Sequence, residues 1–248
     1  WAKYGKSYVS RSMTHEDSSA VMIGINYHHH HHHPSSDQCA RSHSLQQPTA
    51  EERELHTATR EGDAVRVRRL LGKKKELDAM VVLMSLDEDG RTAVHTAAEN
   101  GHVEVIRVLH ELGALIDSRP KQYFDGATPV YVAAQNGQVE AVTLLCELGA
   151  KVETPNHKNV TPVYIAAEQG DVNMVRVLHK LKANVETPDR NGTTPIYIAA
   201  EKGDVKMVRA LHELGANVET PNLNGNTPVY IAAKNGRTVV VRALHELG

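Results

Sequence analysis

The hydrophobic positions of the chain follow helical spacing in short blocks, and the blocks recur along the sequence. One such block begins after Asp171. Its apolar residues are three positions apart and its charged residues lie between them, so the spacing predicts an amphipathic α-helix. The apolar face would carry Val172, Val175, Leu178 and Leu181, and another face would carry Asn173, Arg176 and Lys180.

A second recurring block is richer in alanine and starts with a Thr-Pro pair. These pairs begin at Thr128, Thr161, Thr194 and Thr227, one every 33 residues. An earlier copy starts at Thr92, 36 residues before Thr128, and a degenerate copy around His56 lies 39 residues before His95. Because a fixed period of this length is the mark of stacked supersecondary units, the sequence predicts a repeat array.

Each unit has the same local signals for helix starts and stops. The Thr suits an N-cap and the Pro suits the first helical residue, which has no partner for an amide. The second helix of a unit ends at Gly149 or Gly215, where a positive φ is expected, but the fourth unit has Lys182 there. Asn159 stands where other units have glycine in the connecting turn, and asparagine is the next best residue for a left-handed conformation.

This combination of period, Thr-Pro start, glycine stop and Gly-Ala ending resembles the ankyrin repeat from about residue 51 to 248. Tyrosine replaces the histidine of the family's Thr-Pro-Leu-His tract in four units, and histidine survives at His95 and His56. The resemblance implies an all-α repeat solenoid of helix-turn-helix units linked by β-hairpin-like loops. The expected units are a divergent N-terminal capping repeat at 51–86, repeats at 87–122, 123–155, 156–188 and 189–221, and an incomplete repeat without a C-terminal cap at 222–248.

Residues 1–50 carry no sustained hydrophobic period, so we expect a disordered segment. The segment includes six consecutive histidines, His28 to His33, which are either an expression tag or a chance low-complexity run. The 248 residues are 40% hydrophobic and 23% charged, with a net charge of −2, and no run is long enough for a signal core or a membrane span. Only two cysteines occur, Cys39 and Cys146. These features favour a cytoplasmic protein, with the nucleus as a second location.

No motif predicts catalysis, a cofactor or a metal site. The repeated tyrosines, from Tyr131 onward, are expected to be structural, packed between first helices. Histidines also recur on the second helices, with Cys146 in the matching place of one unit. Packed helices lie about 8–10 Å apart, whereas zinc ligands lie about 2.0–2.3 Å from the ion, so equivalent residues are poorly placed to share a metal.

The resemblance and the absence of chemistry predict a non-enzymatic scaffold that binds a partner protein. One alternative is electrostatic binding of nucleic acid or anionic lipid by the basic run Arg66 to Lys75, and nucleic acid is the less favoured partner. Another is the targeting arm of a larger enzyme. A further expectation is self-association through the uncovered helix Thr238 to Leu247, with Val239, Val240, Ala243 and Leu244 partly exposed.

Contact residues are predicted at positions that vary between units, because the repeated ones are committed to capping and packing. The strongest candidates are Tyr123 and Phe124, which we expect to point into solvent from a hairpin lengthened by three residues. The hairpin positions are Glu88, Asp89, Arg91, Tyr123, Phe124, Asp125, Ala127, His157, Lys158, Val160, Arg190, Asn191, Thr193, Leu223, Asn224 and Asn226. The positions at the ends of first helices are Glu99, Asn100, Gln135, Asn136, Glu168, Gln169, Glu201, Lys202, Lys234 and Asn235.

Overall fold

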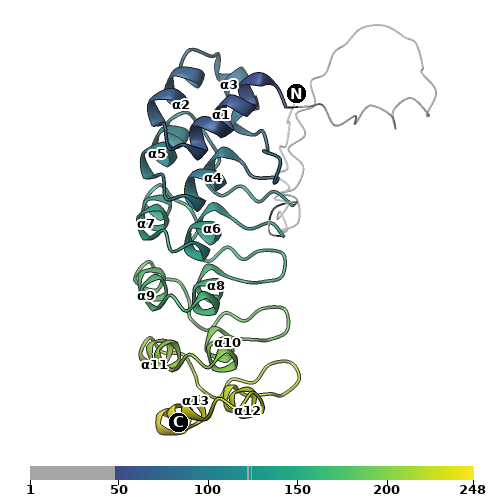
Figure 1. Ribbon diagram of the computed structural model, residues 1–248, viewed down its shortest axis with the longest axis vertical. Coiled ribbons are helices and arrows are strands. Elements are labelled where there is room, and N and C mark those ends of the chain that lie inside the picture. Colours follow the sequence, from purple (N-terminus) through teal and green to yellow (C-terminus); the bar gives the residue numbers. More distant parts are fainter. Residues whose placement is uncertain (1–47, 122, 124) are drawn as a thin grey trace, which may run out of the picture. The chain divides into compact units, whose positions relative to one another are not determined.

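The computed structural model describes residues 48–121, 123 and 125–248, and within them the chain is all helical, with thirteen helices and no strand (Figure 1). Of the segment predicted to be disordered, residues 1–47 lie outside the described residues. The helices are α1 (Ala50–Arg60), α2 (Ala64–Leu71), α3 (Glu76–Leu83), α4 (Ala93–Glu99), α5 (Val103–Glu111), α6 (Pro129–Gln135), α7 (Val139–Glu147), α8 (Pro162–Gln169), α9 (Val172–Lys180), α10 (Pro195–Lys202), α11 (Val205–Glu213), α12 (Pro228–Lys234) and α13 (Thr238–Leu247).

The helices pack in two layers. The first helices of the units, α1, α4, α6, α8, α10 and α12, each contact the next, and the second helices, α2, α5, α7, α9, α11 and α13, do the same. The connecting loops project beside the first-helix layer, away from the second helices (Figure 1). The all-α repeat solenoid predicted from the sequence is therefore confirmed for the described residues.

The first helices start as the Thr-Pro pairs predict. In α8 the hydroxyl of Thr161 accepts a hydrogen bond from the amide of Tyr164, at 3.2 Å, and Pro162 is the first helical residue. The same cap forms in α6, α10 and α12. At α4 the hydroxyl of Thr92 bonds the ring of His95 instead, so it does not cap a backbone amide of this helix.

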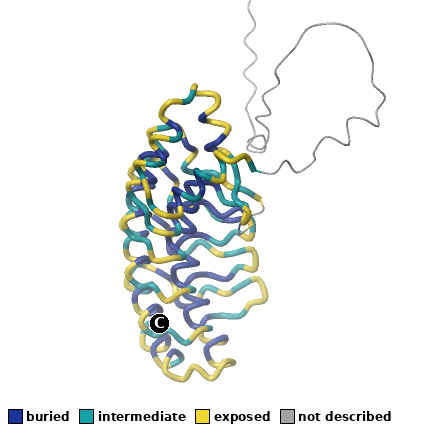
Figure 2. The backbone as a smooth tube through the Cα atoms, turned by 45° about the horizontal axis from the view of Figure 1, so that its top comes forward, coloured by how far each residue is buried: buried dark blue, intermediate teal, exposed yellow. Residues whose placement is uncertain are grey.

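Small side chains let the first helices approach one another closely. The paired alanines of α8 and α10, such as Ala166 and Ala199, are fully buried between neighbouring units. Larger apolar residues from the second helices, such as Val175 and Leu178 of α9, fill the space between the layers. Figure 2 shows these buried residues running through the interior of the array. Because each unit buries its faces only against its neighbours, stability resides in the interfaces between units.

The predicted left-handed positions are also confirmed. Lys182 has φ +75°, beside +100° at Gly149 and +99° at Gly215. Asn159 has φ +62°. Asp125, which the sequence did not mark, is a third non-glycine residue with positive φ in the described part of the chain, at +52°.

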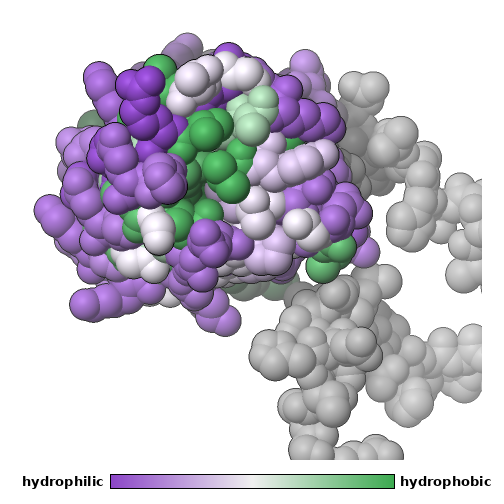
Figure 3. All heavy atoms as spheres, turned by 90° about the horizontal axis from the view of Figure 1, so that it is seen from below, coloured by the Kyte–Doolittle hydropathy of each residue, from purple (hydrophilic) through white to green (hydrophobic). Residues whose placement is uncertain are grey.

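The prediction for the last unit is partly wrong. Val240, Ala243 and Leu244 are buried, because these residues of α13 pack against the preceding unit. The apolar side chains left exposed by the end of the array are Val229 and Tyr230, whose counterparts in the preceding units are buried, and Val239 is exposed on the outer side of α13. Figure 3 looks at this end and shows apolar residues gathered at its centre. Tyr230 is 48% exposed, whereas the tyrosines of the three preceding units are at most 8% exposed.

The first unit contains a helix that the sequence analysis did not predict. Helix α3 lies in the connection between α2 and the hairpin that begins at Asp87. Its Ala79, Val82 and Leu83 are buried. At the start of this unit, Thr49 and Glu52 form a reciprocal capping box, so α1 begins with a defined N-terminus at Ala50.

Candidate functional site

An Asp or Asn side chain organises each regular hairpin. In the fifth unit, Oδ1 of Asp189 accepts the amides of Asn191 and Thr193, both at 2.8 Å. The backbone closes the same turn, since the amide of Asp189 donates to the carbonyl of Thr193 at 2.9 Å. This arrangement satisfies the amides of the turn inside the hairpin and leaves the side chains at its tip turned outward. The matching residues Asp87, Asn156 and Asn222 accept in the same way.

Successive hairpin tips are joined by backbone hydrogen bonds. The amide of His157 donates to the carbonyl of Asp125 at 2.6 Å, and that of Arg190 donates to the carbonyl of Lys158 at 3.1 Å. The amide of Leu223 donates to the carbonyl of Asn191 at 2.9 Å. These bonds fix the spacing of four hairpins, so their outward side chains form one continuous surface on a fixed support.

The third hairpin departs from this pattern, and the prediction that Tyr123 points into solvent is wrong. Tyr123 occupies the position that Asp or Asn holds in the other hairpins, which faces inward, and it is only 5% exposed. Its ring meets that of His95 edge to face, with centroids 5.4 Å apart. Phe124 lies outside the described residues.

His95 links three parts of this interior. Its Nδ1 bonds the hydroxyl of Thr92 at 2.8 Å, and its Nε2 lies 3.0 Å from the carbonyl of Ala127. Since the carbonyl can only accept, the proton is on Nε2 and Nδ1 accepts from the hydroxyl. Burial lowers the pKa of His95 to about 4, so the ring is neutral near neutral pH.

Arg91 closes this region on the outside with a cluster of ion pairs. Its guanidinium contacts Asp87 at 2.8 Å, Asp89 at 2.5 Å and Glu99 at 2.8 Å. Burial opposes the charge, but the bonds to Asp87 and Glu99 outweigh it and raise the pKa of Arg91. The side chain of Arg91 is 13% exposed. Arg91 and Glu99 are therefore already engaged within the fold, beside a hollow of about 350 Å³ that they line with Asp89 and Tyr123.

The other predicted contact residues divide by exposure. Besides Tyr123, the side chains of Ala127 and Thr193 are buried, because they lie where the hairpin meets the first helix, and they offer no surface to a partner. The exposed ones are Glu88, Asp89, Asn100, Asp125, Asn136, Lys158, Gln169, Arg190, Asn191, Lys202, Leu223, Asn224, Lys234 and Asn235. The half-buried ones are Arg91, Glu99, Gln135, His157, Val160, Glu168, Glu201 and Asn226.

The exposed hairpin side chains change in character along the array. Glu88 and Asp89 make the second unit's tip acidic, whereas Lys158 and Arg190 make those of the fourth and fifth units basic. At the sixth unit the tip carries Leu223, which is 77% exposed. Lys158 is partly balanced by Asp125, 2.6 Å away. The surface thus offers different chemistry at different points along one support.

The repeated tyrosines fit the structural interpretation in the internal units. Tyr131, Tyr164 and Tyr197 are buried. Burial raises the pKa of Tyr131 to about 12, with Glu168 adding to the effect. The hydroxyl of Tyr197 accepts from the side-chain amide of Asn222 at 3.4 Å.

The recurring histidines and Cys146 bring no reactive site together. Among the residues that the structure describes, no group of three or more His, Cys, Asp or Glu side chains is placed to hold a metal ion. Burial raises the pKa of the Cys146 thiol to about 11, which keeps it protonated and unreactive near neutral pH.

Three cations of the basic run in the first unit are paired within the fold. Arg66 contacts Glu54 at 2.5 Å and Glu61 at 2.7 Å. The other paired cations are Arg68, 2.6 Å from Glu111, and Lys74, 2.7 Å from Glu51. These pairs reduce the positive potential that a polyanion would need. None of the helices in the described part of the chain is both long and apolar enough to cross a membrane.

Comparison with known proteins agrees with this geometry. The family model for ankyrin repeats (3 copies) matches residues 55–156, 112–189 and 163–248, which together cover the stacked helix pairs and their hairpins. A search of curated proteins found no match. Since the family match spans most of the chain and follows the same repeat seen in the helices, this protein belongs to the ankyrin repeat family.

Proposed function

We propose that this chain is a protein-recognition scaffold whose contact surface is formed by the hairpin tips and the ends of the first helices. Ankyrin repeats generally serve as protein-interaction modules. The observation that carries the proposal is that repeated and variable positions have different structural roles. Residues that repeat unchanged cap, turn or pack, while most of those that vary from unit to unit are exposed or half-exposed on the hairpins and first-helix ends.

A fixed support favours this function because binding then costs little ordering of the surface. Four hairpin tips are held by three backbone bonds, and each tip is closed by its own turn. The partner would span several units and present groups that complement an acidic tip at Glu88, a basic tip at Arg190 and an apolar tip at Leu223. Such a graded surface selects a partner by the order of its groups as well as by their kind.

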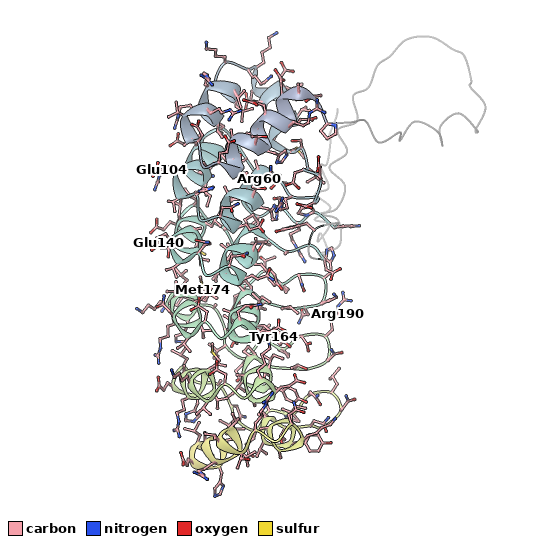
Figure 4. The ribbon with its side chains drawn as sticks, in the orientation of Figure 1. Arg60, Glu104, Glu140, Tyr164, Met174 and Arg190 are labelled. Atoms are coloured by element: carbon pink, nitrogen blue, oxygen red, sulfur yellow. The ribbon has the colours of Figure 1, made fainter. Side chains whose placement is uncertain are left out.

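The test is site-specific photo-crosslinking in the full chain. A photoreactive residue placed at Arg190 samples the hairpin side, and one at Glu104 samples the second-helix layer on the other side of the array (Figure 4). We expect the position-190 probe to capture a defined partner that the position-104 probe does not. Capture of the same protein by both probes, or only from position 104, would overturn the proposed surface.

The second candidate, binding of nucleic acid or anionic lipid by the Arg66–Lys75 run, is less well supported. Arg66, Arg68 and Lys74 already have carboxylate partners within about 2.7 Å. A polyanion would have to compete with them. Binding of a duplex or of anionic vesicles that falls steeply as salt rises would favour this candidate over the first.

A further inference from the structure

Helix α3 is apolar on two opposite faces, and only one of them is covered. Ala79, Val82 and Leu83 pack into the first unit. The opposite face, which we call the α3 stripe, carries side chains between 42% and 63% exposed. The residues of the α3 stripe are Leu77, Met80, Val81 and Met84. They stand at positions i, i+3, i+4 and i+7, the spacing with which a helix presents one continuous face to another element.

The α3 stripe leads into a hollow. Met84, at its end, lines a depression of about 340 Å³ together with Leu86, Leu115 and Pro120. Leu115 is itself 56% exposed. The apolar surface therefore runs from α3 onto the connection that follows α5, and it includes a recess into which a side chain fits. A docked peptide helix can place one of its apolar side chains in this recess.

Cations border this apolar surface at both ends. Lys73 and Lys75 are exposed directly before α3, and Lys75 is its N-cap residue. At the hollow, Arg119 lines the wall and Lys121 is exposed one residue beyond Pro120. The nearby carboxylates Glu76 and Asp78 lie in the first turn of α3, where their negative charge interacts favourably with the helix dipole. These cations favour a ligand that carries negative charge, most strongly at the hollow, whose wall includes Arg119 and no carboxylate.

The size of the surface also selects the ligand. A stable contact between two folded proteins takes about 20–30 residues from each side. The α3 stripe and the wall of the hollow offer far fewer, which is enough for one docked helix but not for a second copy of the chain. Helix-in-groove recognition uses anchors at the spacing seen here.

We propose that the α3 stripe and its hollow form a second docking site, for an acidic amphipathic helix of a partner protein. The site spans the end of the first unit and the connection that follows α5 in the second, and it uses none of the hairpin-tip residues. It is therefore independent of the proposed function, and either can fail without the other.

The methionines of this chain provide a direct readout of the site. Met80 and Met84 belong to the α3 stripe, whereas Met174 and Met207 are fully buried in the fourth and fifth units. With ¹³C-methyl methionine in the full chain, a short synthetic helix of leucine and glutamate should shift the Met80 and Met84 signals. The signals of Met174 and Met207 should stay in place.

Matched probes and variants complete the experiment. The same peptide with lysine in place of glutamate should bind roughly tenfold or more weakly. Val81→Glu should weaken the acidic peptide by about the same factor at an unchanged melting temperature, since its side chain is mostly exposed. Val65→Glu is the control, because Val65 is 79% exposed on α2 and lies off the α3 stripe.

Four results would overturn the proposal. One is the absence of a shift at Met80 and Met84, and another is equal binding of the acidic and basic peptides. A response to anionic phosphatidylserine vesicles but not to the peptide would assign the face to a membrane. Shifts that depend on protein concentration without peptide would assign it to a second copy of the chain.

Discussion

Lys182 has a strained left-handed backbone conformation at a position where the neighbouring units have glycine. It adopts φ +75° after α9, where Gly149 and Gly215 stand in other units. A side chain in this region costs about 1–2 kcal/mol, because Cβ crowds the backbone. Glycine loses more conformational entropy on folding than lysine, and this loss offsets about 0.4–1 kcal/mol of the stabilisation. Lys182 is exposed, so removing its side chain forfeits little else. Lys182→Gly should therefore stabilise the protein by about 0.5–1 kcal/mol.

The assay is equilibrium unfolding in urea, supported by thermal melting. For an array of this size the gain corresponds to a rise in melting temperature of about 1–4 °C. Lys180→Gly is the matched control, because Lys180 is also exposed but ends α9 in the helical region. That change should destabilise by about 0.5–1 kcal/mol. If Lys182→Gly lowered the midpoint as Lys180→Gly does, the left-handed assignment of Lys182 would be refuted.

Three further predictions follow from the interior and the end of the array. Tyr123→Ala should lower the free energy of unfolding by about 3 kcal/mol, because it removes a buried ring that packs against His95. Calorimetry measures this change, and an unchanged melting temperature would place the ring on the surface. Since burial lowers the pKa of His95 to about 4, the unfolded chain takes up a proton at higher pH than the folded one. Stability should thus fall by about 3 kcal/mol as pH drops from about 6.5 to about 4, and the loss should shrink in His95→Gln, as urea titrations at each pH would reveal. Amide exchange should be faster in α12, where Val229 and Tyr230 are exposed, than in α8; equal protection factors would mean that the end face is covered in solution.

The sequence was sufficient for the repeat and for its local exceptions. The 33-residue period and the Thr-Pro starts predicted the paired helices, and the missing glycine at Lys182 predicted its positive φ, because both rest on local backbone chemistry. The exposure of most hairpin-tip residues, such as Arg190, followed from the same alignment of units.

Features that do not repeat from unit to unit were harder to predict. The inserted residues obscure the alignment of Tyr123 with Asp87 and Asp189, so the pattern predicts an exposed side chain. Aligning Gly126 with Gly90 puts Tyr123 at the inward position. The ion pairs of Arg91 depend on Glu99, eight residues away on the following helix, and no short-range pattern marks that pairing. Helix α3 has no counterpart in the other units, so the repeat gave no template for it.

The position of the contact surface is tested most directly by titration calorimetry of the isolated partner against paired sets of variants. Glu88→Lys, Arg190→Glu and Leu223→Ala change the hairpin tips, whereas Glu104→Lys and Glu140→Lys change the second helices on the other side (Figure 4). All five side chains are exposed, so folding should be unaffected. We predict that the hairpin set weakens binding by roughly tenfold or more in at least one variant and that the second-helix set leaves it unchanged. Loss of affinity confined to Glu104→Lys or Glu140→Lys would contradict the account and move the contact surface to the second-helix layer.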